Sequence, residues 1–351
     1  IMRYAIGVDI GTSSTKSVLF DVEGKQIERS GQGYVLKSPQ PGAAEQDPND
    51  IVKATIQTVA EVVQTSGIDP DSLIGIAFSA AMHTLLLLGE DEQPITPMYT
   101  WADNRSNRLT KKVRAKTPNL YRKTSLPIHP MSPVVKLAWL KEEEPDIFEK
   151  AKRVVSIKEY VLNRWCDEWV IDLSIASTTG FLNLASRQWE NDALNVAGIS
   201  ATQLSRIVPT TYQLSLKEAV SQKIGVAAST LGTSGAVRKV VPKPKTAEAA
   251  QLFCYALTED HWVMGGAVNN GGIALQWTRD SLVPYSIPPE ERSLPTAEPS
   301  VSTYERLTAM AARIAPGADG LIFHPHILGE RAPLWDAQAR GNFFGLGRHH
   351  T

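Results

Sequence analysis

The chain has 351 residues, of which 42% are hydrophobic and 21% charged, which describes an ordinary globular protein long enough for two domains. The 36 lysines and arginines nearly balance the 37 aspartates and glutamates, so no bulk charge favours nucleic acid or an anionic membrane surface. The two cysteines form no metal-cluster or disulfide pattern, and no apolar run approaches the ~20 residues that cross a bilayer. We therefore expect a reduced, cytoplasmic setting.

The first predicted elements are strands that enclose a short polar segment. Apolar runs at residues 4–8 and 17–21 predict two strands, and residues 26–34 suit a third, antiparallel strand. Between the first two lies "DIGTSSTK", residues 9–16. This segment fits an ordinary hairpin turn. It also fits a phosphate-binding loop, because glycine lets backbone N–H groups approach an anion and the hydroxyl groups add donors.

Helical and strand patterns alternate after this hairpin. Asp47 as the N-cap and Pro48 at the first helical position predict a helix over residues 47–66. Residues 72–88 predict a buried strand, a crossing of small residues and a second strand. The later predicted elements are a helix over 132–150 broken at Pro145, a strand leading into a helix over 153–166, a strand-like segment at 253–266 and a helix beginning near Gly271. This order predicts a mixed-sheet α/β fold.

The polar segment has an echo later in the chain. "VDIGTSSTKSVLF" (residues 8–20) is similar to "STLGTSGAVRKVV" (residues 229–241), and each copy places a basic residue, Lys16 or Arg238, shortly after Gly-Thr-Ser. Neither copy is a Walker A loop, which has Gly-x-x-x-x-Gly-Lys before a helix. One copy alone favours a turn, whereas two copies favour a pair of hairpins that close on one polyphosphate.

The two hairpins resemble those of the actin-like, ribonuclease-H-like ATPases. Four further stretches narrow the resemblance to the carbohydrate kinases that include glycerol kinase, xylulokinase and gluconokinase; they are "TWADNRS" (100–106), "MSPVVKLAWLKEE" (131–143), "DLSIASTTGFLN" (172–183) and "GERAPLWDAQARGNFFGL" (329–346). Within that family, the stretches "SAAMHTLLLL", "PIHPMSPVVKL" and "FCYALTEDHWVMGGAVNNGGIALQW" look most like bacterial gluconokinases.

The resemblance implies an α/β, ribonuclease-H-like (actin-like ATPase) fold with two similar domains and a cleft between them. It implies a sugar-binding domain over residues 1–245 and the start of a nucleotide-binding domain over residues 246–351. That second domain is expected to be incomplete, because later family segments have no counterpart in the chain.

The resemblance also implies a reaction and its participants. The expected reaction is ATP-dependent phosphorylation of a sugar or sugar-acid hydroxyl, with gluconate to 6-phosphogluconate first and xylulose or another polyol as the alternative. ATP and Mg²⁺ are the implied cofactors. The implied partner is a small sugar or sugar acid, with a possible homodimer and with no nucleic acid or membrane.

Roles for individual residues follow from the same resemblance. Asp9 would hold Mg²⁺, and a turn-capping aspartate is the alternative. The expected ATP contacts are Thr12, Ser13, Lys16, Gly232, Thr233, Gly272 and Gln276. The expected sugar contacts are Met82, His83, Trp101, Asp103 and Met131. A core position is the alternative for Trp101, and an ion pair with Arg105 is the alternative for Asp103. Lys136 is expected to be structural.

The expected proton acceptor is missing from the chain. In the family it is an Asp in a Gly-x-x-Asp segment shortly before the second hairpin, but residues 219–238 contain no Asp, so the catalytic residue is unknown. Either the protein is a non-catalytic nucleotide- or sugar-binding paralogue, or the sequence omits a segment. Omission is favoured, because both flanking hairpins read as intact. The absence of the expected Asp is no reason to assign Asp172 as the base.

Overall fold

The structure is a computed structural model, and the residues it describes are 3–220, 235–246, 252–269, 274, 277, 278, 281, 303–315, 317–332 and 334–347. The chain divides into two compact units, Ile1–Gly232 with Arg238–Gly265, and Thr233–Val237 with Gly266–Thr351. The domain boundary predicted between residues 245 and 246 stays a prediction.

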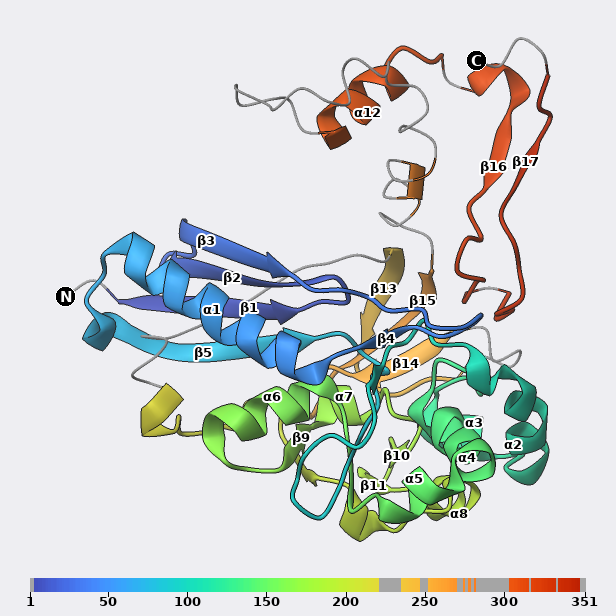
Figure 1. Ribbon diagram of the computed structural model, residues 1–351, viewed down its shortest axis with the longest axis horizontal. Coiled ribbons are helices and arrows are strands. Elements are labelled where there is room, and N and C mark those ends of the chain that lie inside the picture. Colours follow the sequence, from blue (N-terminus) through green and yellow to red (C-terminus); the bar gives the residue numbers. More distant parts are fainter. Residues whose placement is uncertain are drawn as a thin grey trace. The chain divides into compact units, whose positions relative to one another are not determined.

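The first unit is built on a mixed four-stranded sheet (Figure 1). In spatial order its strands are β3 (Gln26–Gly33), β2 (Ser14–Asp21), β1 (Tyr4–Ile10) and β5 (Leu73–Ala80). The first three strands along the chain pair antiparallel, and β5 runs parallel to β1. The predicted hairpin strands and the mixed sheet are confirmed.

Helix α1 (Pro48–Ser66) lies along one face of this sheet (Figure 1). The Asp47 side chain accepts a hydrogen bond from the Asn49 amide at 2.9 Å, and Pro48 needs no partner at the first helical position, so the helix begins where the sequence predicts. Thr58 of α1 contacts Ser17 of β2 through their hydroxyl oxygens, 2.8 Å apart. The buried face of α1 therefore packs on the face of the sheet to which the Ser17 side chain points.

Strand β5 differs from its prediction. The apolar run predicted a buried strand, but the side chains of β5 are half-buried or exposed, and Ile74 is 60% exposed. Within the described part of the chain, β5 is the last strand of the sheet. A continuous apolar run does not distinguish a central strand from one at the edge, and this explains the error.

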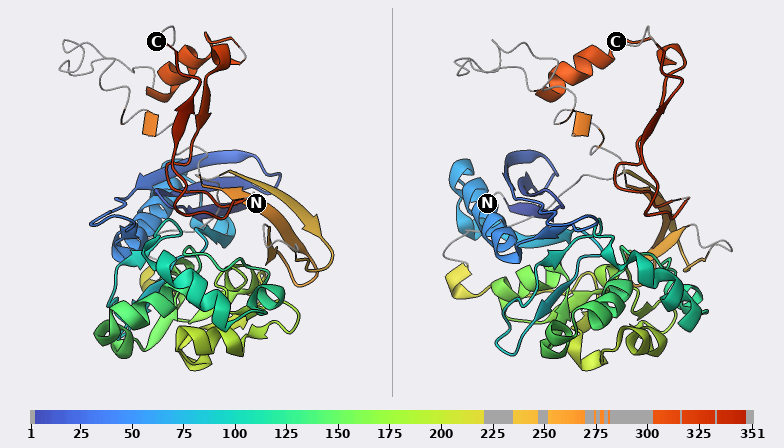
Figure 2. Two further views of the ribbon diagram at one scale, coloured as in Figure 1. Left: turned by 90° about the vertical axis from the view of Figure 1, so that its right-hand side faces the viewer. Right: turned by 45° about the vertical axis from the view of Figure 1, so that its right-hand side comes forward.

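The rest of the first unit combines short helices, coloured teal to yellow-green in Figure 2, with short strand pairs. Its helices are α2 (Thr110–Lys116), α3 (Leu120–Thr124), α4 (Pro133–Glu143), α5 (Pro145–Lys150), α6 (Ile157–Cys166), α7 (Leu173–Ala176) and α8 (Asn191–Ala197). Its short strands are β4 (Glu45–Gln46), β6 (Leu86–Leu88), β7 (Met98–Tyr99), β8 (Arg153–Val155), β9 (Val170–Asp172), β10 (Leu182–Asn183), β11 (Gln188–Trp189) and β12 (Arg206–Val208). The predicted break at Pro145 is confirmed, since α4 ends at Glu143 and α5 begins at Pro145.

The later part of the chain contributes further elements. They are β13 (Gly235–Val241), β14 (Phe253–Ala256), β15 (Trp262–Val268), α12 (Thr303–Ala311), β16 (Ile322–His324) and β17 (Asn342–Phe344). The predicted strand-like segment at 253–266 is an antiparallel hairpin of β14 and β15. The start of the helix predicted near Gly271 lies outside the described residues. No helix among the described residues is long and apolar enough to span a membrane.

Candidate active site

Three polar residues form a row across the sheet of the first unit. Asp9 on β1 is paired with Lys16 on β2 and with Ser79 on β5. Paired residues on neighbouring strands point to the same face, and consecutive residues point to opposite faces. Because Val8 is paired with Ser17, which faces α1, this row lies on the face away from α1.

The surroundings of Asp9 suit a bound cation. Asp9 is only 7% exposed, and the Ser79 hydroxyl donates to its carboxylate at 3.1 Å. Burial raises the pKa of the Asp9 carboxyl above its ordinary value, while the Ser79 hydrogen bond and the charge of Lys16 act in the opposite direction. Mg²⁺ in nucleotide sites is held by one or two carboxylates together with water and phosphate oxygens, so the predicted role fits the residues present.

The hairpin turn between β1 and β2 has its carbonyl groups held by other parts of the unit. The Tyr34 hydroxyl donates to the Gly11 carbonyl at 2.5 Å, and the Gln46 side chain donates to the Thr12 carbonyl at 2.8 Å. The Tyr34 amide donates to the Ser13 carbonyl at 3.2 Å, and the Gly11 amide closes the turn on Ser14 at 3.0 Å. Since these carbonyls are engaged, the turn does not present them to a phosphate.

The donors of the same turn are placed differently. The amides of Thr12 and Ser13 make no backbone hydrogen bond within the described residues. A Cβ at Gly11 would lie 3.0 Å from the Ser14 carbonyl oxygen and 3.4 Å from an Asp9 carboxylate oxygen, so only glycine fits without a shift. With exposed Lys16 on the next strand, the turn offers amide, hydroxyl and ammonium donors, which is the donor set for a phosphate.

Trp101 joins the predicted sugar residues to this turn. Its indole N–H donates to the Thr12 hydroxyl oxygen at 2.9 Å. The ring is 9% exposed and follows β7. A predicted sugar contact and a predicted ATP contact, 89 positions apart, are therefore in direct contact. Their assigned roles stay predictions.

Asp103 lies in a buried ion pair. Its side chain accepts from the Ala44 amide at 2.9 Å and pairs with Arg105 at 2.7 Å, and it has no exposed surface. Arg105 also pairs with Glu45 at 2.5 Å. The guanidinium lies 5.0 Å from the ring centre of Trp139. The ion pair named as the alternative for Asp103 is therefore present, and its contact with a sugar stays a prediction.

Lys136 on α4 occupies the same part of the unit. It is 1% exposed, and its ammonium group donates to the carbonyls of Pro130 and Met131, each at 2.7 Å. Burial lowers the pKa of Lys136 to about 7, with the charge of Asp103 acting in the opposite direction. The ammonium fixes the backbone at Met131, whose side chain is fully buried. Lys136 thus has the structural role that the sequence predicts.

His83 has protein partners at both ring nitrogens. Nδ1 lies 2.7 Å from the Thr178 carbonyl oxygen, and Nε2 lies 3.1 Å from the Tyr255 hydroxyl. A carbonyl only accepts, so Nδ1 carries the proton and donates it. The backbone of His83 has φ 61°, in the left-handed region that non-glycine residues seldom adopt. Its predecessor Met82 is half-buried against the cluster that contains Ile171. Both sugar contacts stay predictions.

Four of the predicted ATP contacts are not among the described residues. Gly232, Thr233, Gly272 and Gln276 lie outside the described residues. In the second unit, Asn269 is buried: its amide donates to Glu330 at 2.8 Å, and Arg331 donates to its side-chain oxygen at 2.6 Å. Glu330 and Arg331 of the "GERAPLW" stretch thus brace the end of β15.

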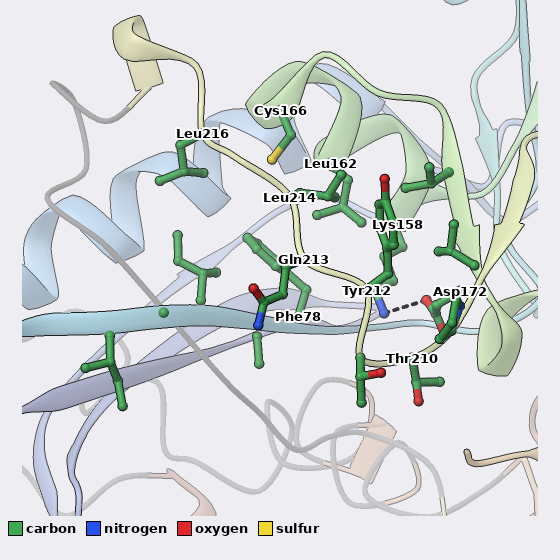
Figure 3. Close-up of a pocket in the computed structure, with 18 of the residues that line it drawn as sticks. Phe78, Lys158, Leu162, Cys166, Asp172, Thr210, Tyr212, Gln213, Leu214 and Leu216 are labelled. Atoms are coloured by element: carbon green, nitrogen blue, oxygen red, sulfur yellow. Dashed lines mark hydrogen bonds and ion pairs between the residues drawn. The ribbon is translucent and has the colours of Figure 1, made fainter. Parts of the chain in front are cut away.

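A separate cavity of about 560 Å³ lies beside β5 in the first unit (Figure 3). Lys158 and Asp172 form an ion pair of 2.7 Å on its wall, and Leu162, Cys166 and Leu214 contribute apolar surface. None of the predicted site residues lines it. Asp172 also caps α7 by accepting from two amides, so its carboxylate is engaged at both oxygens.

The two cysteines are free thiols. Cys166 lies on the cavity wall, and burial raises its pKa to about 11. Cys254 on β14 is buried, and burial raises its pKa as well.

Sequence reasoning missed four residues that hold the site together. Tyr34 and Gln46 fix the turn carbonyls, Ser79 donates to Asp9, and Tyr255 contacts His83. No local pattern marks Gln46 or Tyr255. Tyr34 differs from these two residues, because it ends the third predicted strand. Pairing of that strand with the second strand places Tyr34 opposite Ser13 in the turn.

Two family models match overlapping parts of the chain. "FGGY family of carbohydrate kinases, N-terminal domain" matches residues 4–240, and "FGGY family of carbohydrate kinases, C-terminal domain" matches residues 227–351. The gluconokinase of Bacillus licheniformis is 41% identical over 377 aligned positions, which cover 99% of this chain and 72% of that protein. The alignment is longer than the 351 residues of the chain, so some positions of the relative have no counterpart here.

Solved structures give the same grouping. A gluconate kinase from Lactobacillus acidophilus matches with a TM-score of 0.81 and 34% identity, covering 100% of this chain and 74% of that chain. A ligand-bound xylulose kinase from the same organism matches with a TM-score of 0.81 and 34% identity, covering 99% of this chain and 74% of that chain.

Proposed function

The chain belongs to the FGGY family of carbohydrate kinases, and we propose that it transfers the terminal phosphoryl group of ATP to a hydroxyl of gluconate. The matches to the family models confirm the family predicted from the sequence, and the solved relatives confirm the predicted ribonuclease-H-like fold class. The choice of gluconate is supported by 41% identity to a gluconokinase over 99% of the chain. Xylulose is the competing substrate, because a xylulose kinase structure is as similar as the gluconate kinase structure.

The observation that carries the proposed phosphoryl transfer is the β1–β2 turn. The carbonyls of Gly11 and Thr12 are held by Tyr34 and Gln46, and the amides of Thr12 and Ser13 make no backbone hydrogen bond among the described residues. Lys16 adds a positive charge on the adjoining strand. Oriented donors of this kind stabilise charge on a transferring phosphoryl group without reorganising during the reaction.

The proposal includes a Mg²⁺ ion that Asp9 would hold. The ion would neutralise charge on the ATP phosphates, and the buried Asp9 carboxylate would hold it. Ser79 keeps that carboxylate in position by its hydrogen bond. On the sugar side, Trp101 would supply a flat apolar wall, with Met82, His83, Asp103 and Met131 as the remaining proposed contacts. We further propose a cytoplasmic protein that acts on a small molecule, independent of nucleic acid and membrane, with a homodimer as its assembly.

A second candidate is a protein that binds ATP and a sugar acid without transferring phosphate. It is favoured by one observation: residues 219–238 contain no Asp, where the family places its proton acceptor. The surplus of aligned positions over the 351 residues of the chain agrees with missing residues but does not locate them.

The test measures ADP release with Mg²⁺ and ATP in the presence of gluconate, xylulose, ribulose or glycerol. We expect gluconate to give the fastest release. Faster release with xylulose would move the assignment to that sugar. If no sugar or sugar acid stimulates release while calorimetry detects binding of both Mg-ATP and gluconate, the second candidate replaces the first.

A further inference from the structure

We propose that Trp101 is a positioning residue for the nucleotide, because its indole N–H turns the Thr12 hydroxyl so that the hydroxyl proton is directed at a phosphate of ATP. The inference rests on the proposed function, since it requires ATP at the β1–β2 turn. It adds a role for Trp101 on the nucleotide side, separate from its proposed contact with the sugar.

The direction of the hydrogen bond fixes the hydroxyl. An indole N–H only donates, so the Thr12 oxygen is the acceptor in the 2.9 Å contact. A threonine hydroxyl has one proton, and that proton cannot lie on the axis already occupied by the indole hydrogen. Trp101 thereby restricts the rotation of the hydroxyl and leaves its proton for a second partner. A phosphate oxygen accepts such a proton.

Both ends of this contact are held by neighbouring hydrogen bonds. The Thr12 carbonyl accepts from Gln46 at 2.8 Å, which fixes the turn behind the hydroxyl. Next to Trp101, the Thr100 amide and hydroxyl both bond to the Ala44 carbonyl, each at 3.0 Å. A donor and an acceptor held in this way orient the hydroxyl before the ligand arrives, which lowers the entropy lost on binding.

The contact also couples the two proposed ligands. A sugar that packs on the Trp101 ring would hold the indole N–H in place and so favour the oriented hydroxyl. Linkage then requires that ATP raise the affinity for the sugar by the same factor.

The experiment compares the affinity for Mg-ATP, measured by titration calorimetry without sugar, in wild type, Trp101→Phe and Trp169→Phe. Trp169 is the matched control, because its indole N–H donates to Glu92 at 2.8 Å and no predicted site residue contacts it there. We expect Trp101→Phe to weaken Mg-ATP binding about 5- to 10-fold, as the loss of one oriented hydrogen bond does. Trp169→Phe should stay within about twofold of wild type.

A double-mutant cycle separates positioning from general disturbance of the fold. Thr12→Val should weaken binding at least as much as Trp101→Phe, and adding Trp101→Phe to Thr12→Val should then change little. Thr12→Ser, which keeps the hydroxyl, should recover most of the affinity that Thr12→Val loses, and adding Trp101→Phe to Thr12→Ser should weaken binding again. This Thr12 pair keeps the test decisive if Trp101→Phe lowers the melting temperature.

The outcomes separate the two levels of the proposal. Wild-type protein that binds no Mg-ATP overturns the proposed function and this inference with it. Wild-type protein that binds Mg-ATP overturns the inference alone if Trp101→Phe binds equally well. The inference is also overturned if Trp101→Phe weakens Mg-ATP binding by the same factor in wild type and in the Thr12→Val variant.

Discussion

Two buried aspartates of the first unit have contrasting surroundings. Asp103 accepts from the Ala44 amide and from Arg105, so its charge is matched by a cation and by backbone hydrogen bonding. Asp9 accepts from the Ser79 hydroxyl, and the opposite charge that acts on it, Lys16, has an exposed side chain. Burial is similar, at 0% and 7% exposed, but compensation is not.

The difference separates a region whose buried charge is already matched within the protein from a region where a bound cation could still match it. A carboxylate paired with a guanidinium gains little from a second cation, whereas a carboxylate kept buried with weak compensation gains from one. The raised pKa of Asp9 is the signature of that imbalance. The contrast predicts opposite responses to substitution in the two regions.

The largest effect is expected at Arg105. Arg105→Leu leaves Asp103 and Glu45 buried without their cation and should lower the free energy of unfolding by about 3 kcal/mol, measured by urea titration. Arg206→Leu is the control, because Arg206 pairs with Glu168 on the exposed surface and should change stability far less. Equal effects of the two changes would remove the basis of the comparison.

The next effect concerns Lys136 and depends on pH. Its pKa is about 7 in the folded protein and 10.5 ordinarily, so between these values the unfolded chain binds more protons and stability increases as pH rises. Wild type should therefore gain about 2 kcal/mol relative to Lys136→Met between pH 7 and pH 9. Urea titrations at several pH values measure the gain. Lys141→Met, which changes an exposed lysine of the same helix, is the control.

A smaller change of opposite sign is expected at Asp9. Its raised pKa means that the folded protein binds more protons than the unfolded chain in the acid range, so wild-type stability falls as pH rises there. Asp9→Asn should be as stable as wild type at pH 7, or more stable by up to about 1 kcal/mol, yet lose the Mg²⁺ dependence of ATP binding. Asp103→Asn should instead destabilise. Melting curves and calorimetry with and without Mg²⁺ compare the pair.

The smallest effect is expected at Tyr34. Tyr34→Phe removes the hydrogen bond to the Gly11 carbonyl and should lower stability by about 1 kcal/mol or less. Because the freed carbonyl can then turn toward the phosphate, affinity for Mg-ATP should fall about threefold. A change in melting temperature without any change in affinity would show that the turn does not need this contact.

The elements that the sequence predicted well depend on local signals. The start of α1 follows from Asp47 and Pro48, and the break between α4 and α5 follows from Pro145, because capping and proline act within one turn of the chain. Membership of the family followed from motifs rather than from physics. The burial of β5 was misjudged, because an apolar run carries no information about strand order.

The contacts that define the site join distant positions. Tyr34 and Gly11 are 23 positions apart, Gln46 and Thr12 are 34 apart, and Trp101 and Thr12 are 89 apart. No periodicity or spacing predicts such contacts, since they depend on how separately formed elements pack. The roles at Gly232, Thr233, Gly272 and Gln276 stay predictions for a different reason: these residues lie outside the described part of the chain.

The two thiols have a practical consequence for handling the protein. Cys166 on the cavity wall has a pKa of about 11, and the pKa of buried Cys254 is also raised, so little thiolate exists near neutral pH. Thiolate is the species that attacks alkylating reagents and disulfides. We expect slow labelling of both cysteines, and little need for reducing agents during storage. A reagent that does modify Cys166 would report directly on access to the cavity of Figure 3.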